Sequence, residues 1–508
     1  MRQARRLCSM LLAAALLMCI VPQTALAENP LAADVSALPR IDILGALGPL
    51  YFNEGTPEQE LAFDVDFETL LVALRPIRLE MLKKFLVLDG PAFTDYLVEF
   101  FLAWMGPISK DWDGNDLVPG ITRTTSQYTG AKNGELDENN CASFSYDWRN
   151  DPMDVADELA ATIDEILEKT GADKVNLFSN SGAAMMLTAY LQKYGCGKVA
   201  SVVYNIPLHN GTSVMGKMAT RQVSMDSEAL GKTRTFDQFL MPDLQQTLAP
   251  ILRGMYEVGL LDVISLLVNT VGRTYIDRFY DEAVIPTLFS LPAMWGYVPL
   301  EYYEEAKLSM FKGDPMYDDF IRRIDRYHYE VQANADEILQ KAAAETKLAL
   351  RVGYGMPLLP LVKDSVTQSD AFVDTVLASG GAVCAPLYET LPKDYTQQID
   401  CGHNHISPDR AIDASTCALP EHTWFAYNHP HARQTEYSGW YEWFLRAPDA
   451  TVHGSAEYPQ FVHMVETGVY RPLEPPKVTF QSILMTALLW VLKGWRWVAM
   501  LPWFWLQG

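Results

Sequence analysis

The stretch that decides the fold is VNLFSNSGAA, residues 175–184, where an apolar run leads to a serine and then to small residues. The run 174–178 predicts a short buried strand, and residues 182–194 predict a helix directly after it. Ser181 would then occupy a sharp turn from strand to helix, which presents its hydroxyl away from the backbone. Such a turn needs small residues two positions before and after the serine, and Ser179 and Ala183 satisfy this requirement. The pattern therefore predicts a nucleophile at Ser181; the alternatives are an ordinary serine-capped turn and, less favoured, Ser179.

The flanking segments predict a parallel sheet with helices on both faces. Residues 154–170 have the apolar spacing of an amphipathic helix that Gly171 can cap, and 200–206 and 348–354 resemble buried strands. Strands that alternate with helices at these lengths are typical of βαβ units. Residues 63–105 also have helical apolar spacing, and a polar loop region follows at 110–140.

A long insertion interrupts this alternation between about residues 213 and 345. It has a helical pattern and is rich in Met, Leu, Phe and Tyr. An insertion of this kind between sheet strands suits a lid over a site, with a purely structural subdomain as the alternative. We therefore expect one α/β domain over residues 28–475, with a large helical lid.

The two ends of the chain have their own patterns. Residues 1–27 combine an arginine-rich start, an apolar run and the small-residue site Ala25-Leu26-Ala27, which predicts a secretory signal peptide, with a retained anchor as the alternative. An exported protein would be extracellular or attached to the outer face of a membrane. Residues 476–508 form an apolar tail with five tryptophans, interrupted by Lys493 and Arg496. Tryptophan with scattered basic residues favours the bilayer interface, with a true span or a packed structural element as alternatives.

Composition excludes some classes of function. An apolar content of 49% suits a globular core, and a net charge of −23 argues against nucleic-acid binding, which needs basic patches. Five cysteines remain after the signal segment, so at most two disulfides can form. Cys401, His403 and His405 are close in sequence, but this spacing alone is a weak metal signal, and no metal is expected.

The catalytic acid and base should follow the nucleophile in the order serine, acid, histidine. Asp409 comes at an expected strand end, residues 422–427 form another strand, and His431 follows it. We therefore expect His431 to take the Ser181 proton and Asp409 to orient His431. Asp370 is the rival acid, because it lies closer to the 348–354 strand, and His429 is the rival base.

Three segments give the chain a family resemblance. Residues 144–149, FSYDWR, resemble the Y-D-W-R segment of the lecithin:cholesterol acyltransferase-like branch of the α/β hydrolases. Residues 45–51 stand where that family has its oxyanion loop, although Leu44-Gly45-Ala46 replaces a Pro-Gly pair. Residues 205–212 stand where the family has a proline-containing segment leading to its lid.

The resemblance implies an α/β-hydrolase fold and ester chemistry on a lipid. The backbone N–H groups of Ala46 and Gly182 would form the oxyanion hole, and the mechanism would need no metal or organic cofactor. The implied partners are a lipid or acyl-ester substrate and a membrane surface reached through the tail. A catalytically weak hydrolase-fold protein that binds lipid or a surface partner is the main alternative, and an esterase or peptidase for small polar substrates is less favoured. The sequence does not set the oligomeric state.

Overall fold

The computed structural model describes residues 30–63, 83–84, 89–126, 129–232, 242–431 and 439–475. The signal segment 1–27 and the tail 476–508 lie outside these residues, so both remain predictions. Among the described helices, none combines the length and apolar character that crossing a membrane requires.

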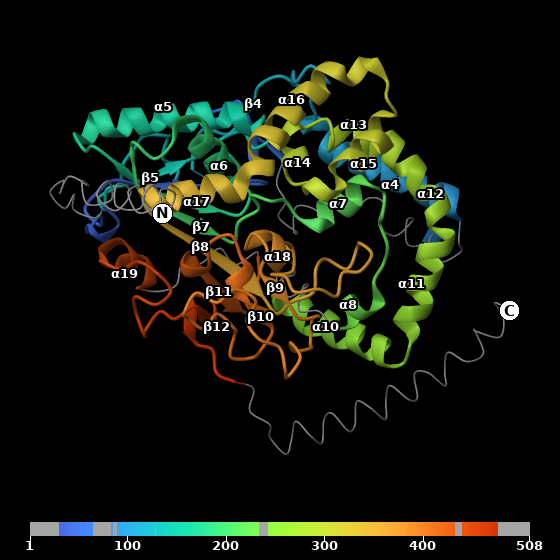
Figure 1. Cartoon of the computed structure of the whole chain (residues 1–508). Helices are drawn as coiled ribbons and strands as arrows, with labels where there is room; N and C mark the ends of the chain where they lie inside the picture. Colours follow the sequence, from blue (N-terminus) through green and yellow to red (C-terminus); the bar gives the residue numbers. More distant parts are fainter. Residues whose placement is uncertain are drawn as a thin grey trace, which may run out of the picture.

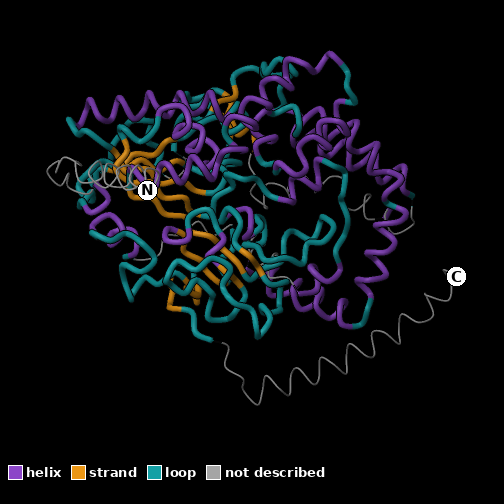
Figure 2. Tube along the Cα trace, viewed as in Figure 1, coloured by secondary structure: helices purple, strands orange, loops and turns teal. Residues whose placement is uncertain are grey.

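A central sheet of eight strands organises the chain (Figures 1 and 2). All neighbouring strands pair in parallel except the last two along the chain, which pair antiparallel. This confirms the predicted mixed α/β class with a mostly parallel sheet. The spatial order is β13 (Val469–Pro472), β12 (Phe461–Glu466), β11 (Thr423–Tyr427), β8 (Lys347–Tyr354), β7 (Val199–Asn205), β6 (Val175–Asn180), β1 (Arg40–Ile43) and β5 (Cys141–Phe144).

Both faces of the sheet are covered by a hydrophobic core. Successive side chains of a strand point to opposite faces, so a single strand contributes to both cores. In β6, Leu177 belongs to the larger hydrophobic core and Phe178 to a second, smaller core. The larger core includes residues of α5 (Pro152–Thr170), α6 (Ala183–Tyr194) and α17 (Ala335–Glu345), and the smaller one includes α19 (Trp440–Arg446). Figure 1 shows α5, α6 and α17 together on one side, with α19 on the other.

The helix α5 illustrates how local sequence sets these elements. The Asp151 side chain accepts a hydrogen bond from the Met153 N–H at its start, and Gly171 ends it in the left-handed conformation with φ of 70°. Between them Val155, Leu159, Ile163 and Ile166 are buried on one face. This is the amphipathic pattern that the sequence predicts.

Helices fill the connection between β7 and β8, beside the sheet in Figure 1. A helix from an earlier part of the chain, α4 (Gly90–Met105), packs against them, with the Phe101 and Phe279 rings 5.4 Å apart. The helix predicted at 63–105 corresponds to α4 at its end, whereas Phe63 ends the strand β3 (Glu60–Phe63) and residues 64–82 and 85–88 lie outside the described residues. The connection contains α7 (Ser213–Ala219), α8 (Ser227–Lys232), α10 (Pro242–Glu257), α11 (Leu260–Val271), α12 (Arg273–Phe279), the π-helix η3 (Tyr280–Val284), α13 (Ile285–Thr287), α14 (Pro292–Gly296), α15 (Leu300–Phe311), η4 (Pro315–Tyr317), α16 (Asp318–Glu330), η5 (Gln332–Asn334) and α17.

Two small sheets and several short helical turns complete the described fold. One sheet is β3 (Glu60–Phe63), β2 (Leu50–Phe52) and β4 (Ile121–Thr122), and the other is β10 (Ile412–Asp413) with β9 (Val383–Cys384). The remaining turns and helix are η1 (Pro30–Ala32), η2 (Gly106–Ile108), α18 (Thr375–Ala378), η6 (Ala414–Thr416) and η7 (Pro420–His422). All five cysteines in the described residues are free thiols.

Candidate active site

Ser181 lies between β6 and α6 in a strained backbone conformation. Its φ is +54°, a region that residues other than glycine rarely adopt. The Ser181 N–H donates to the Asn205 carbonyl at the end of β7 (3.0 Å), and the Leu208 N–H donates to the Ser181 carbonyl (3.3 Å). Both bonds hold the turn against the neighbouring strand. Ser179, in contrast, is buried in β6 and its hydroxyl donates to the Val203 carbonyl (3.2 Å), so it is not available for chemistry.

A chain of two short hydrogen bonds links three side chains that are distant in sequence. Ser181 Oγ lies 2.7 Å from His431 Nε2, and His431 Nδ1 lies 2.7 Å from Asp370 Oδ2. Ser181 follows β6, Asp370 follows β8 and His431 follows β11. The three strands are parallel, so their carboxyl ends share one edge of the sheet. The arrangement is that of a nucleophile, a base and an orienting acid.

Asp370 is held rigidly, which fixes the direction of its second oxygen. Its Oδ1 accepts hydrogen bonds from the backbone N–H groups of Phe372 (3.0 Å) and Val373 (2.7 Å). The residue is only 2% exposed, and its own carbonyl accepts from the His431 N–H (2.8 Å). Because Oδ1 is occupied, Oδ2 faces the imidazole. The Phe372 ring adds a contact to the His431 ring, with centroids 5.2 Å apart.

The prediction that Asp409 orients the histidine is wrong. Asp409 Oδ1 accepts from the Ser407 hydroxyl (2.6 Å) and the Ala411 N–H (3.1 Å), and its Oδ2 accepts from the Tyr354 hydroxyl (3.0 Å). It therefore stabilises its own turn against β8, and Asp370 takes the place beside His431. The sequence does not separate the two candidates, because Asp370 and Asp409 each begin a turn that precedes an apolar residue.

The rival base His429 does not meet the serine. It is buried, and its ring packs against Tyr470 with centroids 5.7 Å apart. Two residues further along the chain, His431 is the histidine that reaches Ser181.

Ala46 and Gly182 lie side by side next to the serine. A Cβ built on Gly182 would be 3.0 Å from the Ala46 Cβ. Within the described part of the chain, neither residue's backbone N–H donates a hydrogen bond to protein, so both are available to an oxyanion. The start of α6 adds its dipole at the same point. These are the two residues that the resemblance indicated for the oxyanion hole.

The loop that contains Ala46 is held on both sides by buried side chains. Arg123 Nη1 donates to the Gly45 carbonyl (3.1 Å), and Trp148 Nε1 donates to the Gly48 carbonyl (2.9 Å).

Trp148 belongs to the FSYDWR segment. Its neighbour Arg149 is fully buried and pairs with Asp147 (2.6 Å) and Asp116 (2.9 Å). The segment thus acts as a structural clamp for the loop and contributes no reacting group.

Tyr297, which no sequence pattern singles out, reaches the site from the helical insertion. It follows α14, is buried, and its hydroxyl would be only 2.2 Å from a Cβ built on Gly182. No protein atom in the described residues hydrogen-bonds this hydroxyl. Burial raises the pKa of Tyr297 well above its usual value, so the group stays a neutral donor. The hydroxyl therefore lies against Gly182 as a neutral donor that has no protein partner in the described residues.

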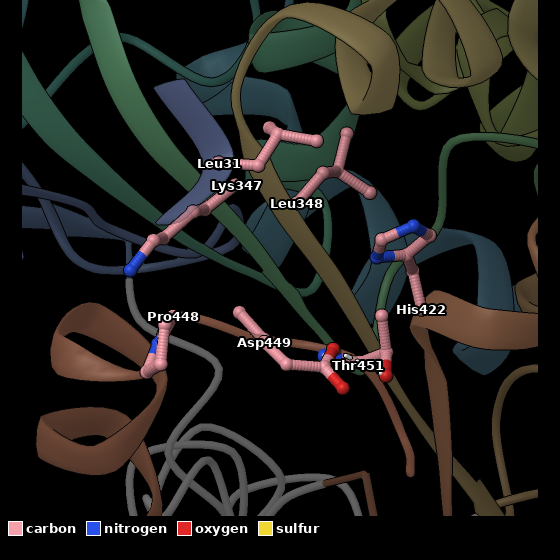
Figure 3. Close-up of a pocket in the computed structure, with 8 residues that line it drawn as sticks. Leu31, Lys347, Leu348, His422, Pro448, Asp449 and Thr451 are labelled. Atoms are coloured by element: carbon pink, nitrogen blue, oxygen red, sulfur yellow. Dashed lines mark hydrogen bonds between the residues drawn. The ribbon is translucent and has the colours of Figure 1, made fainter. Parts of the chain in front are cut away.

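A pocket of about 250 Å³ lies elsewhere on the sheet (Figure 3). Lys347 and Leu348, at the start of β8, line it together with His422, and the triad follows the other ends of the strands. Lys347 Nζ donates to the Leu445 (2.7 Å) and Ala447 (2.8 Å) carbonyls, which ties β8 to the end of α19. The pocket therefore lies at the opposite edge of the sheet from Ser181.

Comparison with known proteins identifies no family. No family model matches the chain, and no curated protein matches it. Among solved structures, it is similar to the Tle4–Tli4 complex at 13% identity and a TM-score of 0.26, over 62% of this chain and 75% of that one. A similarity this low supports no functional conclusion, which leaves the geometry of the site as the basis for inference.

Proposed function

We propose that this protein is a serine hydrolase or acyltransferase of the α/β-hydrolase fold that forms an acyl-enzyme on Ser181. The proposal rests above all on the continuous hydrogen-bonded chain Ser181–His431–Asp370 at the carboxyl edge of a parallel sheet. The family resemblance in the sequence points to the same fold, in its lecithin:cholesterol acyltransferase-like branch.

Each residue has a defined part in this mechanism. His431 Nε2 takes the Ser181 proton as the oxygen attacks the acyl carbonyl, and Asp370 stabilises the imidazolium through Nδ1–H. The negative oxygen of the tetrahedral intermediate accepts hydrogen bonds from the N–H groups of Ala46 and Gly182 and from the Tyr297 hydroxyl. His431 then returns the proton to the leaving alcohol, and water or a second alcohol takes the acyl group by the reverse steps.

A lipid-like ester is the substrate class that the surface favours. Large apolar side chains are exposed on the helical insertion, along α10 and α11 and the turn between them: Ile251, Val258, Leu260 and Leu267. Exposed apolar groups on one insertion mark a surface that meets a membrane or another protein, and a membrane is the choice that fits ester chemistry on a lipid. Such a surface suits a lid that opens at a membrane, and the predicted export signal and tryptophan-rich tail fit the same role.

Fluorophosphonate labelling of the purified protein tests the proposal. The probe should label the wild type at one residue, and Ser181→Ala should lose both labelling and turnover of acyl esters. Ser179→Ala is the matched control, because Ser179 lies two residues away with its hydroxyl bound to Val203; it should keep both. Long-chain esters should be preferred over acetate esters. A folded wild type that neither reacts with the probe nor turns over esters would favour a lipid-binding role without catalysis.

A further inference from the structure

Four side chains that can bind a metal lie together at the start of β11, although nothing in the proposed mechanism uses them. Cys401, His403 and His405 come from one loop, and Glu421 comes from η7, directly before the strand. One ligand atom from each lies within 4.8 Å of every other. His431 follows the opposite end of β11, so this cluster is separate from the triad.

The spacing of the atoms suits a small tetrahedral ion. Glu421 Oε1 lies 3.1 Å from His403 Nδ1 and 3.3 Å from His405 Nε2. Zinc bonds of roughly 2.0–2.1 Å to nitrogen and oxygen place neighbouring tetrahedral ligands about 3.3–3.4 Å apart. Small adjustments of the exposed Cys401 and His403 side chains would complete the geometry.

The surroundings of His405 fix which ring nitrogen faces the cluster. Gln460 Nε2 donates to the Pro420 (2.9 Å) and Thr423 (3.1 Å) carbonyls, so Gln460 Oε1 must accept from His405 Nδ1–H (2.8 Å). In neutral His405, the Nε2 lone pair then points at a carboxylate oxygen. Two acceptors at 3.3 Å need a proton or a cation between them. An outer group that orients a histidine in this way is a regular feature of metal sites.

Further hydrogen bonds hold Glu421 and the backbone of His405 in place. His453 Nε2 lies 2.9 Å from Glu421 Oε2, which leaves Oε1 to the cluster. The Val452 N–H donates to the Glu421 carbonyl (2.9 Å), and the His405 N–H donates to Gln397 Oε1 (2.7 Å). His453 is thus a positioning residue for Glu421.

We propose that Cys401, His403, His405 and Glu421 bind one Zn²⁺ ion in a closed structural site. The set of one sulfur, two imidazole nitrogens and one carboxylate favours zinc over calcium or magnesium, which prefer oxygen. The Cys401 thiol loses its proton on binding, so a thiolate and a carboxylate balance the charge of the ion. The ion fastens the loop around 397–405 to the start of β11. The sequence shows only the weak C-x-H-x-H spacing, and the fold supplies Glu421 and the support from His453 and Gln460.

Metal binding by the purified protein, stripped and then titrated, tests this site without any activity assay. Zinc should bind at one ion per chain in competition with a chromophoric chelator, and cobalt should give the intense visible bands of a tetrahedral ion with a thiolate charge-transfer band. Cys401→Ala should remove that band and weaken zinc by more than about 100-fold, since even outer-shell changes cost about 10–100-fold. His453→Ala should weaken zinc by about 10–100-fold. Cys141→Ala is the matched control, because Cys141 is a free, half-buried thiol in β5, and it should bind zinc normally.

Three results would overturn the proposal: a folded wild type with no stoichiometric zinc, the octahedral spectrum of cobalt bound to water and oxygen, or unchanged affinity in Cys401→Ala. Any of these would leave the four side chains as a polar cluster around Glu421 that holds no metal ion. Because Cys401 and His403 are exposed, their variants should fold even if one at buried His405 does not.

Discussion

Replacing Asp370 by Asn tests the site more sharply than removing the nucleophile, because it asks which carboxylate controls His431. Two backbone N–H groups, those of Phe372 and Val373, point at Asp370 Oδ1. In the Asn variant they must still meet an oxygen, which turns the side-chain NH₂ group toward His431 Nδ1. His431 then has to accept at Nδ1 and carry its proton on Nε2. An Nε2–H cannot take a proton from Ser181.

The expected magnitude follows from this change of tautomer. Loss of the orienting acid in comparable triads lowers kcat by about 10⁴-fold, equivalent to about 5.4 kcal/mol of transition-state stabilisation. Asp370→Asn should therefore lower kcat by this factor with little change in KM, and fluorophosphonate labelling should slow in parallel. The assay is turnover of a chromogenic acyl ester by protein shown to be folded by circular dichroism.

Asp409→Asn provides the matched control. It weakens the hydrogen bonds to Ser407, Tyr354 and Ala411 and should reduce stability while kcat stays within a few-fold of the wild type. The reasoning is refuted if Asp409→Asn abolishes turnover in a folded protein while Asp370→Asn remains within tenfold of the wild type.

Two further substitutions test the surroundings of the triad, and a pH series tests two buried histidines. Tyr297→Phe should lower kcat by about 100-fold, as loss of one oxyanion donor does, without lowering the urea midpoint, because this hydroxyl has no protein partner in the described residues; a lower midpoint with normal kcat would contradict this role. Gly182→Ala would place a methyl group 2.2 Å from the Tyr297 hydroxyl and 3.0 Å from the Ala46 Cβ. This overpacking should cost about 1–3 kcal/mol of unfolding free energy, and adding Tyr297→Phe should restore part of it; equal midpoints for Gly182→Ala and the wild type would refute the close approach. Burial lowers the pKa of His209 to about 4 and that of His328 to about 3. The unfolded chain, with a histidine pKa of about 6.5, then binds more protons below that pH, so stability should fall from pH 7 to pH 5 by about 2 kcal/mol for each histidine. Urea midpoints across that range measure the slope, which His328→Phe should flatten.

Most of the sheet could be predicted from sequence because its signals are local. The apolar runs at β6, β7 and β8, the amphipathic face of α5 and the glycine after it all depend on neighbouring residues. The strand–serine–helix pattern around Ser181 is local for the same reason, and the helices between β7 and β8 follow from their own apolar spacing. The class of fold and the candidate nucleophile could therefore be predicted before the tertiary structure.

The tertiary structure alone decided what surrounds Ser181 and what lies at the other edge of the sheet. Asp370 and Asp409 have similar local sequences, and only the path of the loop after β8 shows which one reaches His431. Tyr297 reaches Gly182 from a helical insertion more than one hundred residues away in sequence. Glu421 likewise joins Cys401, His403 and His405 only because the loop folds back on the start of β11. Residue patterns encode periodicity and turn chemistry, whereas contacts between distant segments depend on how the loops pack across the sheet.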